Sequence, residues 1–240
     1  MSTGIGVGVS PAFRRGAPRF SPLSIAGCKL WLDAAQGVTL NGSNVSAWAD
    51  QSGAGNHATQ GTALRQPAYA AAGWSAGIPT VDFDASNTEW LSFAGTGFPA
   101  DGLTVFCALS QTSTAARQAV IGTGDASSNA FLSSTNTSNV GAYHQGYRQL
   151  AAATTGKQAL AWRRTSIPSG LKGWRGVASL GEVAYSPATT FIWTAPKVGS
   201  LDGATWYLNA RVAEIIVYAS SLSDANVAAV QAYLATRWGI

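Results

Sequence analysis

A long series of short apolar runs constrains this chain more than any other feature of its sequence. Gly, Asn, Ser and Asp separate the runs, and no helical period interrupts them before the C-terminus. Many short runs at close spacing predict an all-β sandwich or barrel. The expected strands span residues 29–32, 45–48, 80–83, 90–93, 103–109, 119–121, 130–132, 159–164, 173–177, 191–193 and 211–218.

The size and composition suit one sandwich domain. A chain of 240 residues can bury a single large β core and still carry extensions. Only 11% of its residues are charged and 27 are glycine, which favours short strands joined by tight turns. Its 9 tryptophans can fill a core or form platforms for sugar rings. We expect half or more of them to be structural.

Charge and hydropathy exclude several partners. The net charge is +4, but the basic residues are scattered and no basic block interleaved with aromatics occurs, so nucleic-acid binding is not supported. No run approaches the roughly 18 apolar residues of a membrane helix, and no leader pattern opens the chain. We therefore expect no membrane insertion and no export signal. Cys28 and Cys107 lie in apolar runs, which favours buried free thiols over a disulfide.

Residues 1–24 form a distinct N-terminal segment. They mix Gly, Pro and Arg without helical or strand periodicity, which predicts an extended arm outside the core, and residues 25–240 then make up the sandwich domain. The side chains by which such an arm could bind a neighbouring subunit are Ile5, Val7, Val9, Phe13, Arg14, Arg15, Arg19 and Phe20.

The C-terminus carries the one clear helical pattern, over residues 223–238. Ser223 is expected to be the N-cap, Leu222 and Val227 a hydrophobic staple, and Gly239 the stop. One helical stripe is apolar and should pack on the sandwich: Val227, Val230, Leu234 and Trp238. The strand before it places Glu214 on one face with Val212 and Ile216. A carboxylate there either contacts a ligand or pairs with an Arg or a backbone amide.

Several blocks of this sequence resemble concanavalin A-like, laminin-G-like domains of bacterial and phage proteins. They are Leu30-Trp31-Leu32-Asp33-Ala34, Val45-Ser46-Ala47-Trp48-Ala49-Asp50-Gln51-Ser52-Gly53 running into Gly55-Asn56-His57-Ala58, Pro79-Thr80-Val81-Asp82-Phe83-Asp84 followed by Trp90-Leu91, and Ala213-Glu214-Ile215-Ile216-Val217-Tyr218 with Leu222-Ser223-Asp224 and the terminal Tyr233-Leu234 to Trp238-Gly239-Ile240. In this order the blocks cover roughly residues 25–240. The resemblance implies a two-sheet antiparallel jelly-roll sandwich. It also implies binding of carbohydrate or protein by a concave face or by rim loops, without fixing the ligand.

Two functions follow from this resemblance. The leading hypothesis is a non-enzymatic structural protein of a tailed-phage virion, a head decoration or tail component made in the host cytoplasm. Its arm would bind other virion proteins or copies of itself. The alternative is a carbohydrate-binding module that adsorbs to a host-surface glycan. The aromatic and neighbouring side chains least typical of a core are Tyr143, His144, Tyr147 and Trp174, which makes them the candidate sugar contacts.

Catalysis and metal binding have weaker support. Glycoside hydrolysis needs two facing carboxylates, and the Glu-x-Asp-x-x-Glu strand motif of related glucanases is missing, so we expect no enzyme. Laminin-G-like domains often hold Ca²⁺ in rim loops. The candidate ligands for such a site are Asp33, Asp50, Asp82 and Asp84. Asp50 can instead cap a turn by accepting hydrogen bonds from nearby backbone amides, with Asn56 and His57 in the same structural role.

Overall fold

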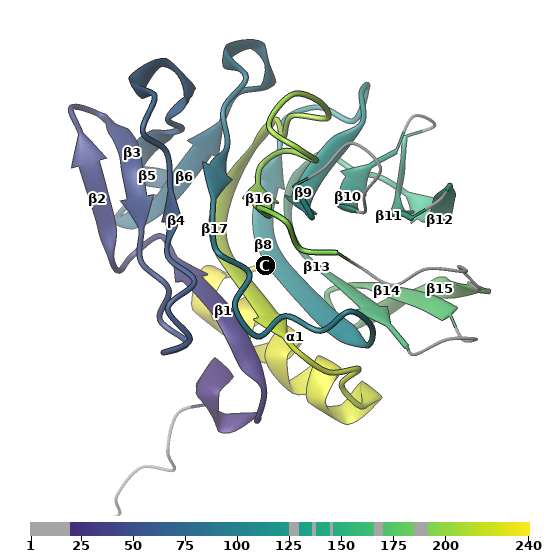
Figure 1. Ribbon diagram of the computed structural model, residues 1–240. Helices are drawn as coiled ribbons and strands as arrows, with labels where there is room; N and C mark the ends of the chain where they lie inside the picture. The colour runs from purple at the N-terminus through teal and green to yellow at the C-terminus, as the bar shows by residue number, and fades with distance from the viewer. Residues whose placement is uncertain (1–19, 125–129, 136–137, 145, 166–169, 185–191) are drawn as a thin grey trace, which may run out of the picture.

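The chain folds as two antiparallel layers with one helix on the outer side of one layer (Figure 1). The computed structural model describes residues 20–124, 130–135, 138–144, 146–165, 170–184 and 192–240. Within them the all-β sandwich and the C-terminal helix expected from the sequence are confirmed.

The first sheet lies beneath the helix and is built around two long strands. Its order is β15 (Ala178–Ala184), β14 (Gly170–Arg175), β13 (Gly156–Arg164), β8 (Leu103–Gln111) and β17 (Ala210–Tyr218). The far edge of β17 is shared by β1 (Cys28–Asp33) and β6 (Ile78–Phe83), and β5 (Ala68–Ser75) pairs with β6.

The second sheet forms the opposite layer. Its order is β12 (Tyr147–Ala152), β11 (Asn139–Tyr143), β10 (Ala130–Ser134), β9 (Gln118–Gly122), β16 (Lys197–Val198), β7 (Leu91–Ser92), β4 (Ala58–Thr59), β3 (Asn44–Trp48) and β2 (Val38–Asn41). The short helices η1 (Pro22–Ser24), η2 (Ala63–Arg65) and η3 (Ala85–Asn87) lie in the connections.

Both faces of β8 are buried, which explains its continuous apolar run. Val105 and Cys107 point into the core between the sheets, whereas Phe106 and Ala108 belong to the cluster under the helix. The buried tryptophans are Trp48, Trp74, Trp162, Trp174 and Trp238. They outnumber the half-exposed ones, as expected.

The strands that the sequence did not predict are mostly half exposed or very short. They are β2, β4, β5, β11, β12, β15 and β16. No residue of β12 and none of β15 is buried, so neither strand carries the apolar run that marks a core strand. The strand expected at residues 191–193 was wrong where it can be judged, because Ile192 and Trp193 lie in no strand, and residue 191 is outside the described residues.

Helix α1 (Asp224–Trp238) confirms the expected boundaries. Ser223 caps it, because the Ser223 hydroxyl accepts a hydrogen bond from the Asn226 amide at 3.2 Å. Gly239 ends it with a φ of 65°, a left-handed conformation that glycine adopts without strain. The predicted apolar stripe is buried against the first sheet: Val227, Val230, Leu234 and Trp238.

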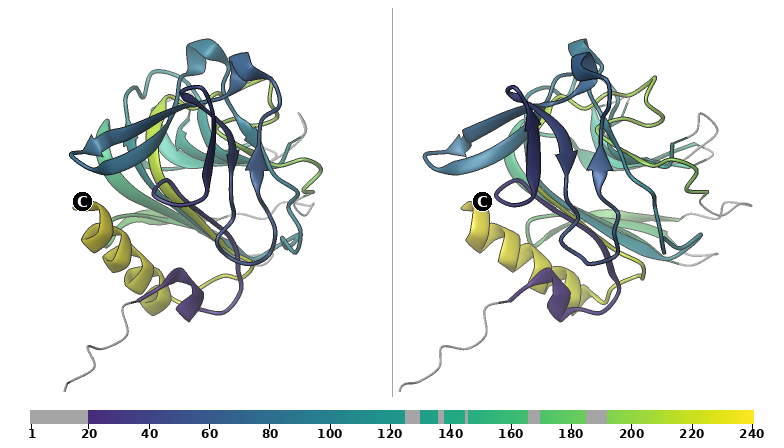
Figure 2. Two further views of the ribbon diagram at one scale, coloured as in Figure 1. Left: turned by 90° about the vertical axis from the view of Figure 1, so that its left-hand side faces the viewer. Right: turned by 60° about the vertical axis from the view of Figure 1, so that its left-hand side comes forward.

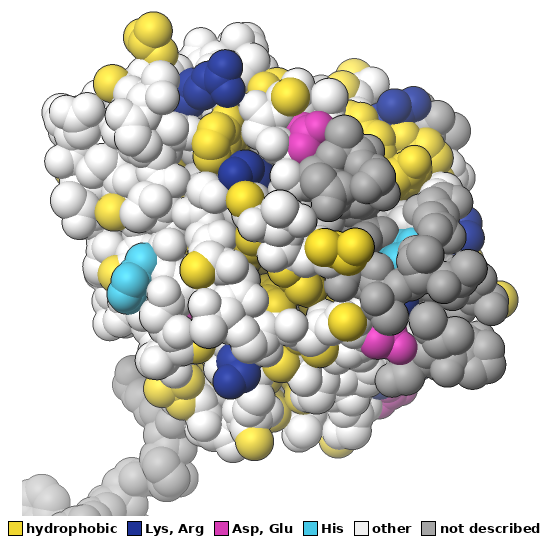
Figure 3. All heavy atoms as spheres, viewed as in Figure 1, with side chains coloured by type: hydrophobic (Ala, Val, Ile, Leu, Met, Phe, Trp, Pro, Cys, Tyr) yellow, Lys and Arg dark blue, Asp and Glu magenta, His cyan; other side chains and the backbone are white. Residues whose placement is uncertain are grey.

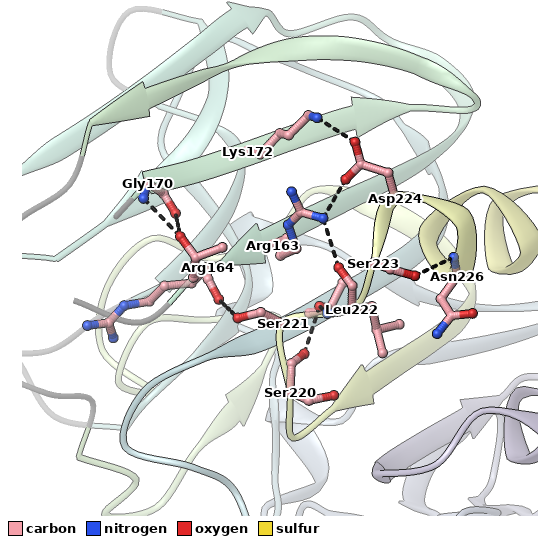
Figure 4. A network of polar contacts seen from close by, with 12 residues as sticks. Arg163, Arg164, Gly170, Lys172, Ser220, Ser221, Leu222, Ser223, Asp224 and Asn226 are labelled. Carbon is pink, nitrogen blue, oxygen red and sulfur yellow. Dashed lines mark hydrogen bonds and ion pairs between the residues drawn. The ribbon is translucent and has the colours of Figure 1, made fainter. Parts of the chain in front are cut away.

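The first turn of α1 is also tied to two strands by charge. Asp224 accepts hydrogen bonds from Arg163 at 2.5 Å and Lys172 at 2.8 Å (Figure 4). These bonds hold the pKa of Asp224 below its usual value. Arg163 also donates to the Leu222 carbonyl at 2.8 Å. The loop that enters the helix is thereby fastened to β13 and β14.

Replacing Ser223 with Ala should lower the free energy of unfolding by about 1 kcal/mol, because the Asn226 amide loses its cap. Urea denaturation followed by circular dichroism measures this loss. Ser75→Ala at the exposed end of strand β5 is the control and should change stability by less than about 0.5 kcal/mol. Equal stability of the two variants would show that the cap contributes nothing.

The last residues of the expected arm belong to the folded domain. Phe20 packs against Tyr233 of α1 with ring centroids 5.5 Å apart, and the Tyr218 hydroxyl donates to the Pro22 carbonyl at 2.8 Å. Figure 2 shows η1 beside the helix. The other arm residues named above, from Ile5 to Arg19, lie outside the described residues. For them the assembly role stays a prediction.

Both cysteines are free thiols, as predicted. Burial raises the pKa of the Cys28 thiol to about 12, and Cys107 is fully buried in β8. Neither therefore forms a thiolate near neutral pH, which makes both unreactive. Among the described residues no helix is both long and apolar enough to cross a membrane.

Candidate functional site

Three half-buried aromatic side chains gather on the outer side of the second sheet. Tyr143 ends β11, Tyr147 begins β12, and Trp206 lies in the loop between β16 and β17. They pack against small apolar residues of β9 and β10 that face away from the interior. In the space-filling view, hydrophobic side chains gather at the upper right, close to basic ones (Figure 3). We call these three residues, together with Arg117, the aromatic face.

The strand pairing and the ring packing fix the positions of the three rings. Tyr143 and Tyr147 face each other across the β11–β12 pairing, with ring centroids 5.1 Å apart. Trp206 meets Tyr143 edge to face at 4.9 Å and 90°. The rings of Trp206 and Tyr147 are closer to parallel, at 31° and 5.9 Å. We call the neighbouring rings of Tyr147 and Trp206 the platform.

Trp206 is held in a strained backbone conformation. Its φ is 55°, in the left-handed region that a bulky side chain rarely adopts. The preceding turn is tightly bonded, because Asp202 Oδ1 accepts from the amides of Ala204 at 2.8 Å and Thr205 at 2.7 Å. The amide of Ala119, in strand β9, donates to the Trp206 carbonyl at 2.9 Å. Such conformations persist only where the surroundings enforce them, and they cluster at ligand sites.

Arg117 covers the platform. Its guanidinium carbon lies 5.1 Å from the ring centroid of Tyr147 and 5.4 Å from that of Trp206, both within cation–π range. The Arg117 side chain itself is exposed. Burial raises the pKa of the Tyr147 hydroxyl, although the Arg117 charge opposes the rise. Tyr147 consequently stays neutral and can donate or accept a hydrogen bond.

Two of the four candidate sugar contacts, His144 and Trp174, are buried. Only 1% of His144 is exposed, and only 6% of Trp174. Trp174 belongs to the cluster under α1, and Arg163 and Lys172 lie 5.1 and 5.2 Å from its ring centroid. The neighbouring basic and glycine residues suggested an exposed ring, but the basic side chains fold over it. Neither residue presents a ring to solvent, so these two predictions were wrong.

Asp50 confirms the structural interpretation of its motif. Its carboxylate accepts hydrogen bonds from the amides of Trp31 at 2.9 Å, Ser52 at 2.8 Å and Asn56 at 3.0 Å. The Asp50 amide in turn donates to Nδ1 of His57 at 3.0 Å. The motif thus builds a loop and ties it to β1, because the Asp50 carboxylate accepts from backbone amides of both.

The four candidate calcium ligands do not converge. Asp33 pairs with Arg237 and accepts from the Ala35 amide at 2.9 Å. Asp82 bonds Thr80 and pairs with Arg211, and Asp84 caps η3 by accepting from the Ser86 amide at 2.8 Å. Within the described ranges no three His, Cys, Asp or Glu side chains are grouped as metal ligands. The carboxylates serve four different local structures.

Glu214 is a fully buried acid held between α1 and the first sheet. Its Oε1 accepts hydrogen bonds from Trp31 Nε1 at 2.6 Å and the Tyr233 hydroxyl at 2.9 Å, and its Oε2 from Trp238 Nε1 at 2.6 Å. Arg237 lies 3.6 Å from Oε2. Burial raises the pKa of Glu214 to about 7, against the effect of these donors. The interpretation as a paired structural carboxylate is confirmed.

The face of β17 that carries Glu214 differs from the expected one. A bulge between Val212 and Glu214 adds a residue to β17, which resets the alternation of its side chains. Val212 points into the core between the sheets, whereas Ile216 lies under the helix. Glu214 shares the side of Ile216, because its partners Tyr233 and Trp238 are on α1.

No protein-family model matches the chain, and no curated protein matches it. Solved structures do share its fold. Domain 4 of AbnA, a GH43 extracellular arabinanase from Geobacillus stearothermophilus in complex with arabinotriose, has a TM-score of 0.60 at 11% identity, over 85% of this chain and 98% of that one. A Trypanosoma rangeli sialidase in complex with 2,3-difluorosialic acid has a TM-score of 0.61 at 12% identity, over 95% and 36%.

A botulinum neurotoxin type C structure, described as entering cells through interaction with two ganglioside molecules, has a TM-score of 0.55 at 6% identity, over 87% of this chain and 51% of that one. The chain thus spans about a third of the sialidase and half of the neurotoxin chain. At such identities the likeness concerns the fold, and this chain has the fold of a lectin-like β-sandwich.

Proposed function

We propose that this protein binds carbohydrate without cleaving it, and that the aromatic face is the binding site. The observation that carries the proposal is the cluster of half-buried Tyr143, Tyr147 and Trp206 on the outer side of a sandwich sheet. Aromatic rings bind the apolar faces of sugars, and their polar tips bind hydroxyl groups. The AbnA domain with the same fold was solved with arabinotriose, and the neurotoxin is described as interacting with gangliosides.

The rigidity of the site supports this proposal. The left-handed backbone at Trp206 and its bond to the Ala119 amide hold the ring in place before any ligand arrives. A preorganised contact loses little side-chain entropy on binding. A tryptophan held at this strained position is more useful for binding than for the core, since ordinary core positions provide buried rings without strain.

The absence of catalysis is part of the proposal. A glycosidase needs two carboxyl groups that face each other across the scissile bond, about 5 to 10 Å apart. Glu214 lies beneath α1, and both of its oxygens accept hydrogen bonds. Asp82 bonds the Thr80 hydroxyl, and Asp84 caps η3. None of these three carboxylates belongs to the aromatic face. They support a binding role rather than hydrolysis.

The virion role stays a separate prediction. The solved structures with this fold give no support to a phage particle, a head or a tail, and the carbohydrate-binding alternative is the better supported. The structure refines the test of the arm, because Phe20 and Pro22 contact the domain. A truncation that probes assembly alone should therefore remove residues 1–19 and keep η1.

A glycan array probed with the purified protein tests the proposed function. Wild type should bind at least one glycan, and Trp206→Ala should weaken that binding at least about tenfold, because a central aromatic contact is lost. Tyr69→Ala removes a half-buried aromatic ring on β5 and serves as the matched control, with binding unchanged. The same mixtures, analysed by chromatography, should contain no cleaved product.

Each other outcome contradicts one part of the proposal. Failure to bind any glycan would reject carbohydrate binding itself. Binding that survives both Trp206→Ala and Tyr147→Ala would place the site elsewhere on the molecule. Released sugar that disappeared in Asp82→Asn would show that the protein is an enzyme.

A further inference from the structure

The aromatic face differs from an open stacking platform because a cation covers it. Arg117 lies over the rings of both Tyr147 and Trp206, at 5.1 and 5.4 Å from their centroids. A neutral sugar that stacked on this platform would have to displace the guanidinium and lose the cation–π contacts, which are worth about 0.5–1 kcal/mol at an exposed site. The group offered to an arriving ligand is thus a positive charge held on an aromatic base.

The charge of Arg117 is not neutralised within the part of the chain that the structure describes. The ion pairs found there involve other arginines and a lysine. Asp202 lies on the loop that carries Trp206, but its Oδ1 accepts from two backbone amides and the Thr205 hydroxyl. This carboxylate builds the turn and forms no ion pair with Arg117.

Arg117 places a planar fork of N–H groups over these rings. A guanidinium that lies on an aromatic base keeps its N–H groups at its edges, where they can bond to two oxygens at once. A carboxylate has the matching geometry, and charge-assisted pairs of this kind are among the stronger hydrogen bonds in proteins. Two neighbouring hydroxyls of a neutral sugar can also offer two oxygens, but they carry no charge.

We infer that the aromatic face selects acidic sugars, with Arg117, held over the platform, binding the sugar carboxylate while Tyr143 contacts the pyranose ring. This inference rests on the proposed carbohydrate binding and adds the ligand class to it. Arg117 then acts as a specificity residue, because it contributes charge recognition whereas the rings contribute contact area.

Two matched pairs of probes test the inference: tetragalacturonate with its methyl ester, and sialyllactose with lactose. Titration calorimetry should show that wild type binds the acidic member of at least one pair about tenfold or more tightly than the neutral member, since a charged hydrogen bond adds about 1.5–3 kcal/mol. Raising the salt concentration should weaken the binding of the acidic probe and leave the binding of the neutral probe unchanged. Arg117→Gln should remove the preference, and Arg117→Lys should restore part of it.

Arg211→Gln is the matched control, because Arg211 is an exposed arginine on the first sheet. It should keep the wild-type preference. Equal affinity for acidic and neutral members would overturn the inference and leave carbohydrate binding intact, as would array binding to neutral glycans alone. A preference that survives Arg117→Gln would overturn it as well. Failure to bind the four probes and every array glycan would reject the proposed function together with the inference.

Discussion

Replacing Glu214 with Leu should lower the free energy of unfolding by about 3–5 kcal/mol, because three donors lose their acceptor at a cost of about 1–3 kcal/mol each. Four donors surround this carboxylate: the indole N–H groups of Trp31 and Trp238, the Tyr233 hydroxyl and the Arg237 guanidinium. Leucine fills a similar volume but accepts nothing, so the two indole N–H groups and the Tyr233 hydroxyl would lose their acceptor, whereas Arg237 keeps Asp33. Urea denaturation measures the loss.

Glu182→Leu is the control, since Glu182 lies exposed on β15 and should change stability by less than about 0.5 kcal/mol. Glu214→Gln provides a finer comparison. The Gln amide keeps one accepting oxygen but turns its N–H₂ group toward other donors. The free energy of unfolding should therefore fall less than in Glu214→Leu, but still measurably. A Glu214→Leu variant as stable as wild type would show that the buried donors find other acceptors.

The same residue should make stability depend on pH. Burial raises the folded-state pKa of Glu214 to about 7, from 4.5 for an unperturbed glutamate. Between these values the folded state binds a proton that the unfolded state does not. The contribution of Glu214 is therefore fully present below about pH 4.5 and falls by about 3 kcal/mol as the pH rises through 7. The free energy of unfolding should be measured against pH in wild type and in Glu214→Leu. The difference between the two curves isolates the contribution of Glu214.

Replacing Trp238 with Ala should cost about 3–5 kcal/mol, the range for truncating a buried tryptophan. Only 3% of Trp238 is exposed, and its ring packs 6.2 Å from that of Trp74, whose indole donates to the Trp238 carbonyl at 2.7 Å. Trp238→Phe keeps most of the volume and loses only the bond to Glu214, so it should cost much less. A loss below about 1 kcal/mol for Trp238→Ala would show that the helix end is loosely docked.

The two variants should not be additive. Glu214 and Trp238 share a hydrogen bond of 2.6 Å, so the second substitution removes a contact that the first has already broken. The double variant should therefore be more stable than the sum of the single losses predicts. Strict additivity would mean that the bond between the two residues adds no coupling energy.

The sequence predicted the elements whose signals are local. Helix α1 was found with its cap and stop because Ser223, the apolar stripe and Gly239 lie within a few residues of one another. Strand β17 was found too, but not the face of Glu214, because a bulge shifts the alternation without leaving a mark in the sequence. The half-exposed strands β12 and β15 have no apolar run and escaped for that reason.

The candidate site shows the same limit. Tyr143 and Tyr147 were identified because their polar neighbours set them apart from core residues. Trp206 and Arg117 were missed, since their proximity to the tyrosines depends on a strained loop and on contacts between residues far apart in the chain. Trp174 looked exposed because its basic neighbours suggested a solvent-facing ring, whereas Lys172 of the same strand and Arg163 of β13 cover it.

The central place of β17 has a consequence for how the molecule folds. This strand pairs with β1, β6 and β8, and the bond from Trp31 to Glu214 joins positions 183 residues apart. Strands this far apart in the sequence can pair only after large loops have closed, and loop closure costs entropy before any contact forms. Folding is therefore expected to be slow. On a ribosome, β1 and β6 would leave the exit tunnel long before their partner is synthesised, and their unpaired edges would need protection until residue 218 emerges.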